Sequence, residues 1–242
     1  MNIIRLLIIG AKGRMGMTVA DLAQREEGLE ITGQCDLGDS IEPAIQNCDV
    51  IIDFSQPGAI EEVCRGALAH ARPLVIGTTG HSAEQRGMIE NVAQSVPVVL
   101  ASNFSVGVNA LFWLTRRAAE LLGREFDLEI VEMHHRMKKD APSGTAKTLA
   151  EILQKARKTE KVRHGREGNL GERDPSEIGI HSIRGGDAVG DHTVVFAGPG
   201  ERLELTHRAS SRETFAKGAL RAARWIIGKP AGLYNMQDVL GL

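Results

Sequence analysis

A chain of 242 residues can form one large domain or two smaller ones. Its formal net charge of −2 and aromatic content of 4% argue against a nucleic-acid surface and against stacking of single-stranded bases. Three cysteines without a C-x-x-C pair favour buried free thiols over a disulfide framework or a zinc site. The apolar segment 3–9 is too short to span a bilayer and is followed by no signal-peptide cleavage site, which predicts a cytoplasmic protein without a membrane partner.

The first hundred residues alternate between predicted strands and predicted helices. Residues 3–9 form a near-continuous aliphatic run, as expected for a parallel strand buried on both faces, and further strands are predicted at 29–35, 50–54, 73–77 and 96–101. A helix is predicted at residues 15–25, and segments 59–71 and 83–95 are long enough for crossover helices. This alternation predicts an α/β unit with an open parallel sheet and helices on both faces.

The pattern changes after residue 103. The sequence predicts helices at 109–122 and after Pro142, and strands at 126–133, 179–184, 193–197 and 203–208. We interpret the basic, polar stretch 155–173 as a solvated loop. Successive strands without helices between them predict a second domain of α+β type with an antiparallel or mixed sheet. A final helix at 213–227 could close this second domain or return to the first.

A glycine-rich turn, Gly10-Ala-Lys-Gly13-Arg-Met-Gly16, separates the first predicted strand from the first predicted helix. Glycines at such a place let the backbone approach a pyrophosphate, and the helix N-terminus attracts the phosphate charge. Asp36 follows the second strand, where an acid would accept hydrogen bonds from ribose hydroxyls. Lys12 stands where the usual fingerprint has a glycine, and a tight turn without a ligand is the alternative. Strand, helix and acid together favour a dinucleotide site.

A second dense polar region, EMHHRMKKDAPSGT, spans residues 132–145. Ser143 is a predicted N-cap, and the N–H groups behind it would bind a carboxylate or phosphate. The side chains that add donors, positive charge and proton-transfer capacity are His134, His135, Arg136 and Lys138. The region therefore indicates a pocket for a small anionic molecule.

Plainer interpretations of this region remain open at this point. Paired histidines at a strand end can be ordinary polar loop residues, and Lys138-Lys139 can be a solvated charge run. We expect no metal site, because adjacent histidines point in opposite directions from a strand and no acid or histidine stands at ligand spacing.

With these residues, the sequence resembles the 4-hydroxy-tetrahydrodipicolinate reductase (dihydrodipicolinate reductase) family. The matching strings run in order across nearly the whole chain, and HHRxKxDAPSGTA is highly specific. They are GAKGRMG from residue 10, VIIDFS from 50, GTTG from 77, ASNFSVGVN from 101, EMHHRMKKDAPSGTA from 132, IRGGD from 183, GDH from 190 and LTHRASSR from 205.

The resemblance implies a Rossmann domain that binds NAD(P)H, formed by residues 1–105 plus 213–242. It implies a substrate-binding and oligomerisation domain of mixed sheet at residues 106–212. Members of the family are usually homotetramers joined through the sheets of this second domain. The implied reaction is reduction of 4-hydroxy-2,3,4,5-tetrahydrodipicolinate to 2,3,4,5-tetrahydrodipicolinate plus water, in lysine and diaminopimelate biosynthesis.

The resemblance also assigns roles to matching residues. His134 would be the general acid/base and Lys138 the proton donor. The groups that grip the substrate carboxylates would be His135, Ser143, Gly144 and Thr145. The cofactor would be bound by Gly10, Ala11, Lys12, Gly13, Arg14 and Met15 at the pyrophosphate, by Asp36 at the adenosine ribose, and by Gly77, Thr78, Thr79, Ala101, Ser102, Asn103 and Phe104 toward the nicotinamide.

Two positions bear on the choice of cofactor. Some relatives carry an arginine at the places of Leu37 and Gln56, where it would pair with the 2′-phosphate of NADPH. Asp36 would also repel that phosphate. These features favour NADH, although charge from Lys12 and Arg14 keeps NADPH as an alternative.

Other classes of protein fit the sequence less well. A Rossmann dehydrogenase for another small acid would not need the HHRxKxDAPSGT string. A nucleotide-sensing regulatory protein would be expected to lack His134 or Lys138, and both are present. A structural or nucleic-acid-binding module would need a basic face or a base-reading motif, which the sequence does not indicate.

Overall fold

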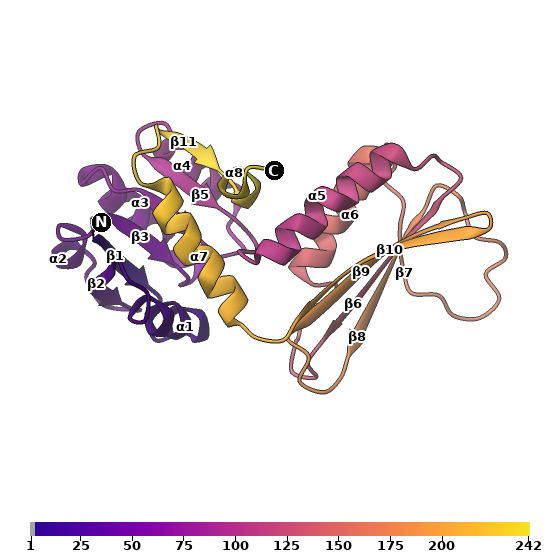
Figure 1. Cartoon of the computed structure of the whole chain (residues 1–242), viewed down its shortest axis with the longest axis horizontal. Coiled ribbons are helices and arrows are strands. Elements are labelled where there is room, and N and C mark those ends of the chain that lie inside the picture. The colour runs from indigo at the N-terminus through magenta and orange to yellow at the C-terminus, as the bar shows by residue number, and fades with distance from the viewer. Residues whose placement is uncertain (1–2) are drawn as a thin grey trace. The chain divides into compact units, whose positions relative to one another are not determined.

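The computed structural model describes residues 3–242, and its contacts divide the chain into two compact units (Figure 1). The first unit extends to Val106 and includes Arg212–Leu242, and the second is Gly107–Ser211. The second unit is therefore inserted into the first in the sequence. None of the helices in residues 3–242 is both long and apolar enough to cross a membrane.

A parallel sheet of six strands forms the centre of the first unit, in the order β11-β5-β4-β3-β1-β2. Its strands are β1 (Ile4–Ile9), β2 (Leu29–Cys35), β3 (Val50–Asp53), β4 (Leu74–Ile76), β5 (Pro97–Leu100) and β11 (Gly232–Tyr234). Strands β3 and β4 are buried throughout, as expected for parallel strands covered on both faces. The predicted parallel sheet is thus confirmed, with the sixth strand β11 added by a segment for which no strand was predicted.

Helices cover both faces of this sheet. One face packs against α1 (Arg14–Ala23), α7 (Glu213–Ile226) and α8 (Met236–Leu240). The other packs against α2 (Glu42–Ile45), α3 (Ile60–Ala69) and α4 (Ala83–Val92), with a short 3-10 helix η1 (Pro57–Ala59) before α3. Helix α7 places Ala216, Ala219 and Ile226 in the core, so the final long helix returns to the first unit.

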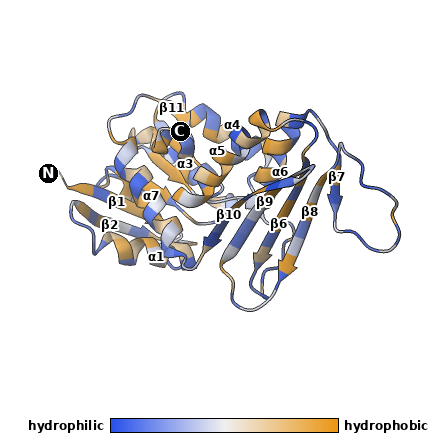
Figure 2. Cartoon of the chain, turned by 45° about the vertical axis from the view of Figure 1, so that its right-hand side comes forward, coloured by the Kyte–Doolittle hydropathy of each residue, from blue (hydrophilic) through white to orange (hydrophobic). Residues whose placement is uncertain are grey.

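The second unit is a mixed sheet with two helices on one face. Its strands are β6 (Asp127–His134), β7 (Val162–His164), β8 (Ile178–Arg184), β9 (Gly190–Gly198) and β10 (Glu201–Ala209), in the order β10-β9-β6-β8-β7. β6 pairs parallel with β8 and antiparallel with β9. Helices α5 (Val106–Leu121) and α6 (Gly144–Arg157) share one apolar core with this sheet. Hydrophobic and hydrophilic residues alternate along its strands (Figure 2), which confirms the predicted α+β unit.

The interpretation of residues 155–173 as a solvated loop is wrong in part. The stretch contains the end of α6 and all of β7. Arg166 and Arg173 lie within it, and both form ion pairs with the carboxylate of Glu129 on β6. The sequence alone suggested solvated charges because Glu129, the partner of both arginines, is 37 residues from Arg166 and 44 residues from Arg173 in the sequence.

Candidate cofactor and active sites

Two glycines shape the turn between β1 and α1. Gly10 has a φ of 78°, and a Cβ there would lie 2.5 Å from the carbonyl oxygen of Phe54. A Cβ on Gly16 would overlap the carbonyl of Gly10. The N-cap residue of α1, Gly13, offers no side chain to the first N–H groups of the helix. These donors are the type that bind phosphate at helix N-termini, so the turn fits a pyrophosphate.

Asp36 ties this turn to the end of β2. Its carboxylate accepts hydrogen bonds from the backbone N–H of Lys12 at 2.7 Å and of Leu37 at 2.8 Å. The bonds from Leu37 and Lys12 lower the pKa of Asp36. Asp36 is therefore an anion at neutral pH, with its position fixed by the turn that it faces.

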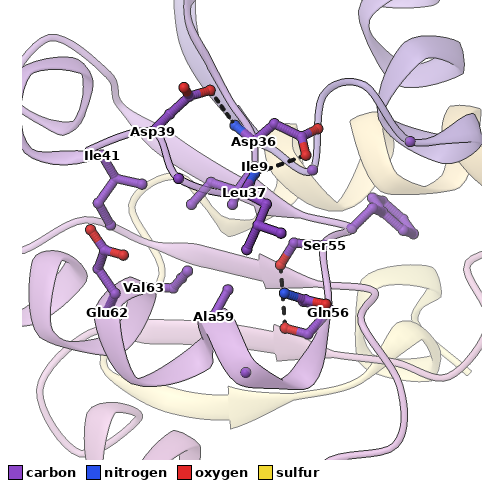
Figure 3. Close-up of a pocket in the computed structure, with 15 residues that line it drawn as sticks. Ile9, Asp36, Leu37, Asp39, Ile41, Ser55, Gln56, Ala59, Glu62 and Val63 are labelled. Atoms are coloured by element: carbon purple, nitrogen blue, oxygen red, sulfur yellow. Dashed lines mark hydrogen bonds between the residues drawn. The ribbon is translucent and has the colours of Figure 1, made fainter.

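A cavity of about 410 Å³ opens beside Asp36 (Figure 3). Its walls come from the carboxyl ends of β1, β2 and β3 and from α3. The strand order reverses between β1 and β3, and open α/β sheets bind ligands at this reversal. Three of its lining residues are acidic, Asp36, Asp39 and Glu62, whereas none within residues 3–242 that lines it is a lysine or arginine. The cavity is therefore suited to binding an uncharged, hydroxyl-rich group rather than an anion.

The remaining predicted cofactor residues follow neighbouring strands of the same sheet. Gly77, Thr78 and Thr79 come directly after β4, and residues 101–104 come directly after β5. Because these strands are parallel, both segments lie at the sheet edge that carries the glycine turn. The ring of Phe104 packs edge-on against Phe54 at a centroid distance of 5.6 Å. The structure thus gathers the predicted cofactor residues along one edge of one sheet.

The centre of the second unit's polar site is a buried pair on β6, His134 and Glu132. Nδ1 of His134 lies 2.6 Å from a carboxylate oxygen of Glu132. The guanidinium of Arg184 donates to both oxygens of Glu132, each at 2.8 Å. Burial alone would raise the pKa of Glu132, but the hydrogen bonds led by Arg184 lower it to about 2. Burial lowers the pKa of His134 despite the neighbouring carboxylate.

The start of α6 lies against this pair. Ser143 caps the helix as predicted, since its hydroxyl accepts a hydrogen bond from the N–H of Ala146 at 3.2 Å. The backbone N–H of Ser143 donates to Glu132, and its hydroxyl lies 2.9 Å from Nε2 of His192. Burial lowers the pKa of His192 to about 3, so this imidazole is neutral. Gly144 and Thr145 form the first turn behind the cap.

Lys138 and His135 belong to the loop that joins β6 to α6. The ammonium of Lys138 donates to the carboxylate of Asp140 at 2.8 Å, and the backbone N–H of His135 donates to the carbonyl of Ala188 at 2.7 Å. The ion pair lowers the pKa of Asp140. The loop therefore holds the ammonium of Lys138 next to the carboxylate of Asp140, a few residues after β6 ends at His134.

Three polar residues of this site were not predicted from the sequence: Glu132, Arg184 and His192. Glu132 and His192 are almost fully buried, and Arg184 approaches Glu132 from a strand 52 residues away. A signal for Glu132 was present, because it falls on the core-facing positions of an alternating strand where a charge is unusual. Arg184 and His192 fall within the strings IRGGD and GDH that carry the family resemblance, but their partners depend on the register of β6 with β8 and β9.

The fold is that of a nucleotide-dependent two-domain enzyme, with a glycine turn and an acidic cavity in one unit and a buried histidine–carboxylate cluster in the other. Residues 4–104 match the family described as "Dihydrodipicolinate reductase, N-terminus", and residues 107–240 match "Dihydrodipicolinate reductase, C-terminus". The chain belongs to the dihydrodipicolinate reductase family, whose members are pyridine-nucleotide-dependent oxidoreductases.

Individual relatives with the name of this enzyme family align with nearly the whole chain. The chain is 54% identical over 242 residues to a 4-hydroxy-tetrahydrodipicolinate reductase of Akkermansia muciniphila, covering 99% of this chain and 98% of the relative. It is 44% identical to the enzyme of the same name from Syntrophotalea carbinolica, covering 99% of each. A dipicolinate-bound dihydrodipicolinate reductase from Paenisporosarcina sp. TG-14 superposes with a TM-score of 0.79 at 26% identity, covering 98% of each chain.

Proposed function

We propose that the chain reduces 4-hydroxy-2,3,4,5-tetrahydrodipicolinate to 2,3,4,5-tetrahydrodipicolinate plus water, in lysine and diaminopimelate biosynthesis. The observation that carries the proposal is the cluster at the end of β6. It places a buried imidazole, an ammonium and a capped helix N-terminus within one short segment. This combination suits a ring that carries two carboxylates and must receive a proton. The relatives named for this reaction cover nearly the whole chain.

The proposed chemistry has one hydride step and one proton step. The substrate loses its 4-hydroxyl with a ring proton as water, which leaves a conjugated imine. Bound NAD(P)H supplies the hydride that is added at ring C4. Electron density then moves toward the ring nitrogen, and the resulting enamine needs a proton. His134 and Lys138 are the proposed acid/base and donor for that transfer, while His135, Ser143, Gly144 and Thr145 hold the carboxylates.

We propose NADH as the favoured cofactor. The support is the composition of the cavity beside β2, whose acidic residues would repel a 2′-phosphate. Lys12 and Arg14, the residues that could have favoured NADPH, do not line this cavity. The glycine turn at residues 10–16 is proposed to hold the pyrophosphate, and Asp36 the ribose hydroxyls.

We also propose a homotetramer joined through the second unit. Both helices of that unit pack on one face of its sheet, and the opposite face, with Val131, Thr193 and Val195, receives no helix from residues 107–211. These three side chains are only partly exposed. The face is proposed to pair with the same face of a second copy.

The reaction can be tested with substrate made freshly by condensing pyruvate with aspartate semialdehyde. We expect the purified protein to oxidise NADH in its presence, at a rate proportional to enzyme concentration. Lys138→Ala should lower kcat at least a hundredfold with little change in NADH binding, because a positioned proton donor contributes about that factor. Lys139→Ala, the adjacent cation, is the matched control. A folded, NADH-binding protein without turnover would contradict the proposal and favour a nucleotide sensor.

A further inference from the structure

The carboxylate of Glu132 has no exposure to solvent and is held by donors from three elements. Arg184 on β8 donates to both oxygens, the Ser143 N–H at the start of α6 donates to one, and Nδ1 of His134 lies against the other. Burying a charge costs free energy, and pairing with an opposite charge offsets that cost only in part. Replacing a buried ion pair with apolar side chains of similar size therefore often leaves stability unchanged. A carboxylate at this position therefore calls for a reason beyond packing.

The carboxylate decides which nitrogen of His134 carries the proton. An ionised carboxylate can only accept hydrogen bonds, so the imidazole nitrogen at 2.6 Å from it must be the donor. In the neutral ring Nδ1 is then protonated and Nε2 is bare. Nε2 is left free to take up and deliver a proton on the side of the ring away from Glu132.

The same carboxylate also supports Lys138 through two further contacts. Arg184, while paired with Glu132, donates to the backbone carbonyl of Asp140 at 2.7 Å. The side chain of Asp140 accepts from the Lys138 ammonium at 2.8 Å. Glu132 thus contacts His134 directly and is connected to Lys138 through Arg184 and Asp140, and these are the two residues proposed to transfer protons.

We infer that Glu132 is a positioning residue that sets the tautomer of His134 and, through Arg184, the place of Lys138. The inference rests on the proposed role of His134 in the reaction. Glu132 itself acts through the imidazole and is not assigned a contact with substrate.

The charged and titratable groups that face His134 come from every element around it. They are Glu132 on its own strand, Lys138 in the following loop, Arg184 on β8 and His192 on β9. Glu132 is the member that favours the imidazolium, whereas burial, Lys138 and Arg184 oppose it. Loss of the Glu132 charge therefore lowers the pKa of His134 further.

The variant Glu132→Gln separates these effects. Arg184 and the Ser143 N–H compete for the single amide oxygen, so the amide NH₂ turns toward Nδ1 and the tautomer inverts. We expect ¹⁵N spectra of histidine-labelled protein to show Nδ1–H in the parent and Nε2–H in the variant, with the imidazole titrating at lower pH. kcat should fall about a hundredfold, the usual contribution of a positioned acid or base, with KM for NADH unchanged. In the pH–rate profile, the limb governed by His134 should move to lower pH.

Glu129 provides a matched control on the same strand. It faces the opposite side of β6 and also lies 2.8 Å from a histidine, His181, with arginine partners. Glu129→Gln makes the same chemical change at a similar pair and should leave the His134 tautomer and the pH–rate profile in place.

A double variant keeps the test informative if Glu132→Gln unfolds. Glu132→Gln with Arg184→Met removes the buried carboxylate together with its arginine partner and should fold. Because the Ser143 N–H still requires the amide oxygen, the inverted tautomer and the lower pKa of His134 persist. Retention of Nδ1–H with the parent pKa in both folded variants, or an unchanged kcat, would overturn the inference. The tautomer is measured without substrate, so it stands apart from the proposed function, which fails if the parent enzyme has no turnover.

Discussion

Gly190 on β9 faces the ring of His134 so closely that a Cβ on the glycine would stand 3.0 Å from Nε2. That nitrogen is the one turned away from Glu132, and it is the proposed site of proton transfer. The glycine therefore leaves room for Nε2 at this point of β9, while the ring of His192, further along the same strand, packs edge-on against the imidazole at a centroid distance of 5.1 Å.

Gly190→Ala is expected to fold and to lose activity. A methyl group at 3.0 Å must displace the imidazole by a few tenths of an ångström, and small misplacements of a reacting group are costly in rate. We expect kcat to fall about tenfold or more, with KM for NADH near the parent value. Gly185→Ala is the control, since its Cβ would meet only Met133 at 3.5 Å. Equal kcat values for parent and Gly190→Ala would contradict the assigned place of Nε2.

The acidic cavity in the first unit leads to a prediction about the cofactor. Glu62 on α3 lines the cavity, whereas its neighbour Glu61 does not. Glu62→Lys should raise kcat/KM for NADPH about tenfold, because a repelling carboxylate is replaced by an ammonium next to the 2′-phosphate. Glu61→Lys makes the same charge change outside the cavity and should leave the NADH/NADPH ratio unchanged. A parent enzyme that strongly prefers NADPH would refute the proposed preference.

The buried titratable groups predict a fall in stability toward acid. Burial lowers the pKa of His192 from 6.5 to about 3, so the unfolded chain binds its proton first and stability declines as pH falls below 6.5. The pKa of Glu132 and of Glu129 is lowered from 4.5 to about 2, which steepens the decline below pH 4.5. At about 1.4 kcal/mol per pKa unit, the full loss of stability across each transition is on the order of 3 to 5 kcal/mol per group.

Urea unfolding followed between pH 7 and pH 3 tests this dependence. The free energy of unfolding should decrease continuously over that range, and Glu129→Gln should flatten the curve below pH 4.5 but not above it. A parent protein whose stability is constant from pH 6.5 to pH 4 would show that His192 is not buried as a neutral group.

The proposed tetramer can be tested at Val195. This residue lies directly opposite Glu129 in the register of β9 with β6. In Val195→Lys the new ammonium lies next to Glu129 and the arginines paired with it, and it adds a positive charge to the face that is proposed to pair with a second copy. Sedimentation should show a smaller species than for the parent, with unchanged circular dichroism. Leu121→Lys, at an exposed position on α5 and so outside this face, is the control.

Local patterns in the sequence were sufficient for much of the fold. Strand β2 has the bounds that were predicted for it, and Ser143 caps α6 as its place before the helix indicated. Short elements escaped prediction because three or four residues carry too little periodicity, as for α2 and β11. The partners of Glu132 escaped because pairing between strands distant in sequence depends on the folded register, which no local pattern contains.

The order of the units along the chain affects how the protein is made. Ribosomes deliver residues 107–211 before α7 and β11, so the inserted unit has all of its strands while the first sheet still lacks an edge strand and two of the helices, α7 and α8, on one face. Until α7 arrives, α1 alone covers that side, and the core around Leu6, Ile8 and Ile52 is incomplete. We therefore expect the nascent N-terminal half to depend on chaperones. Truncation of about the last thirty residues should yield insoluble protein even though both proposed active-site segments are intact.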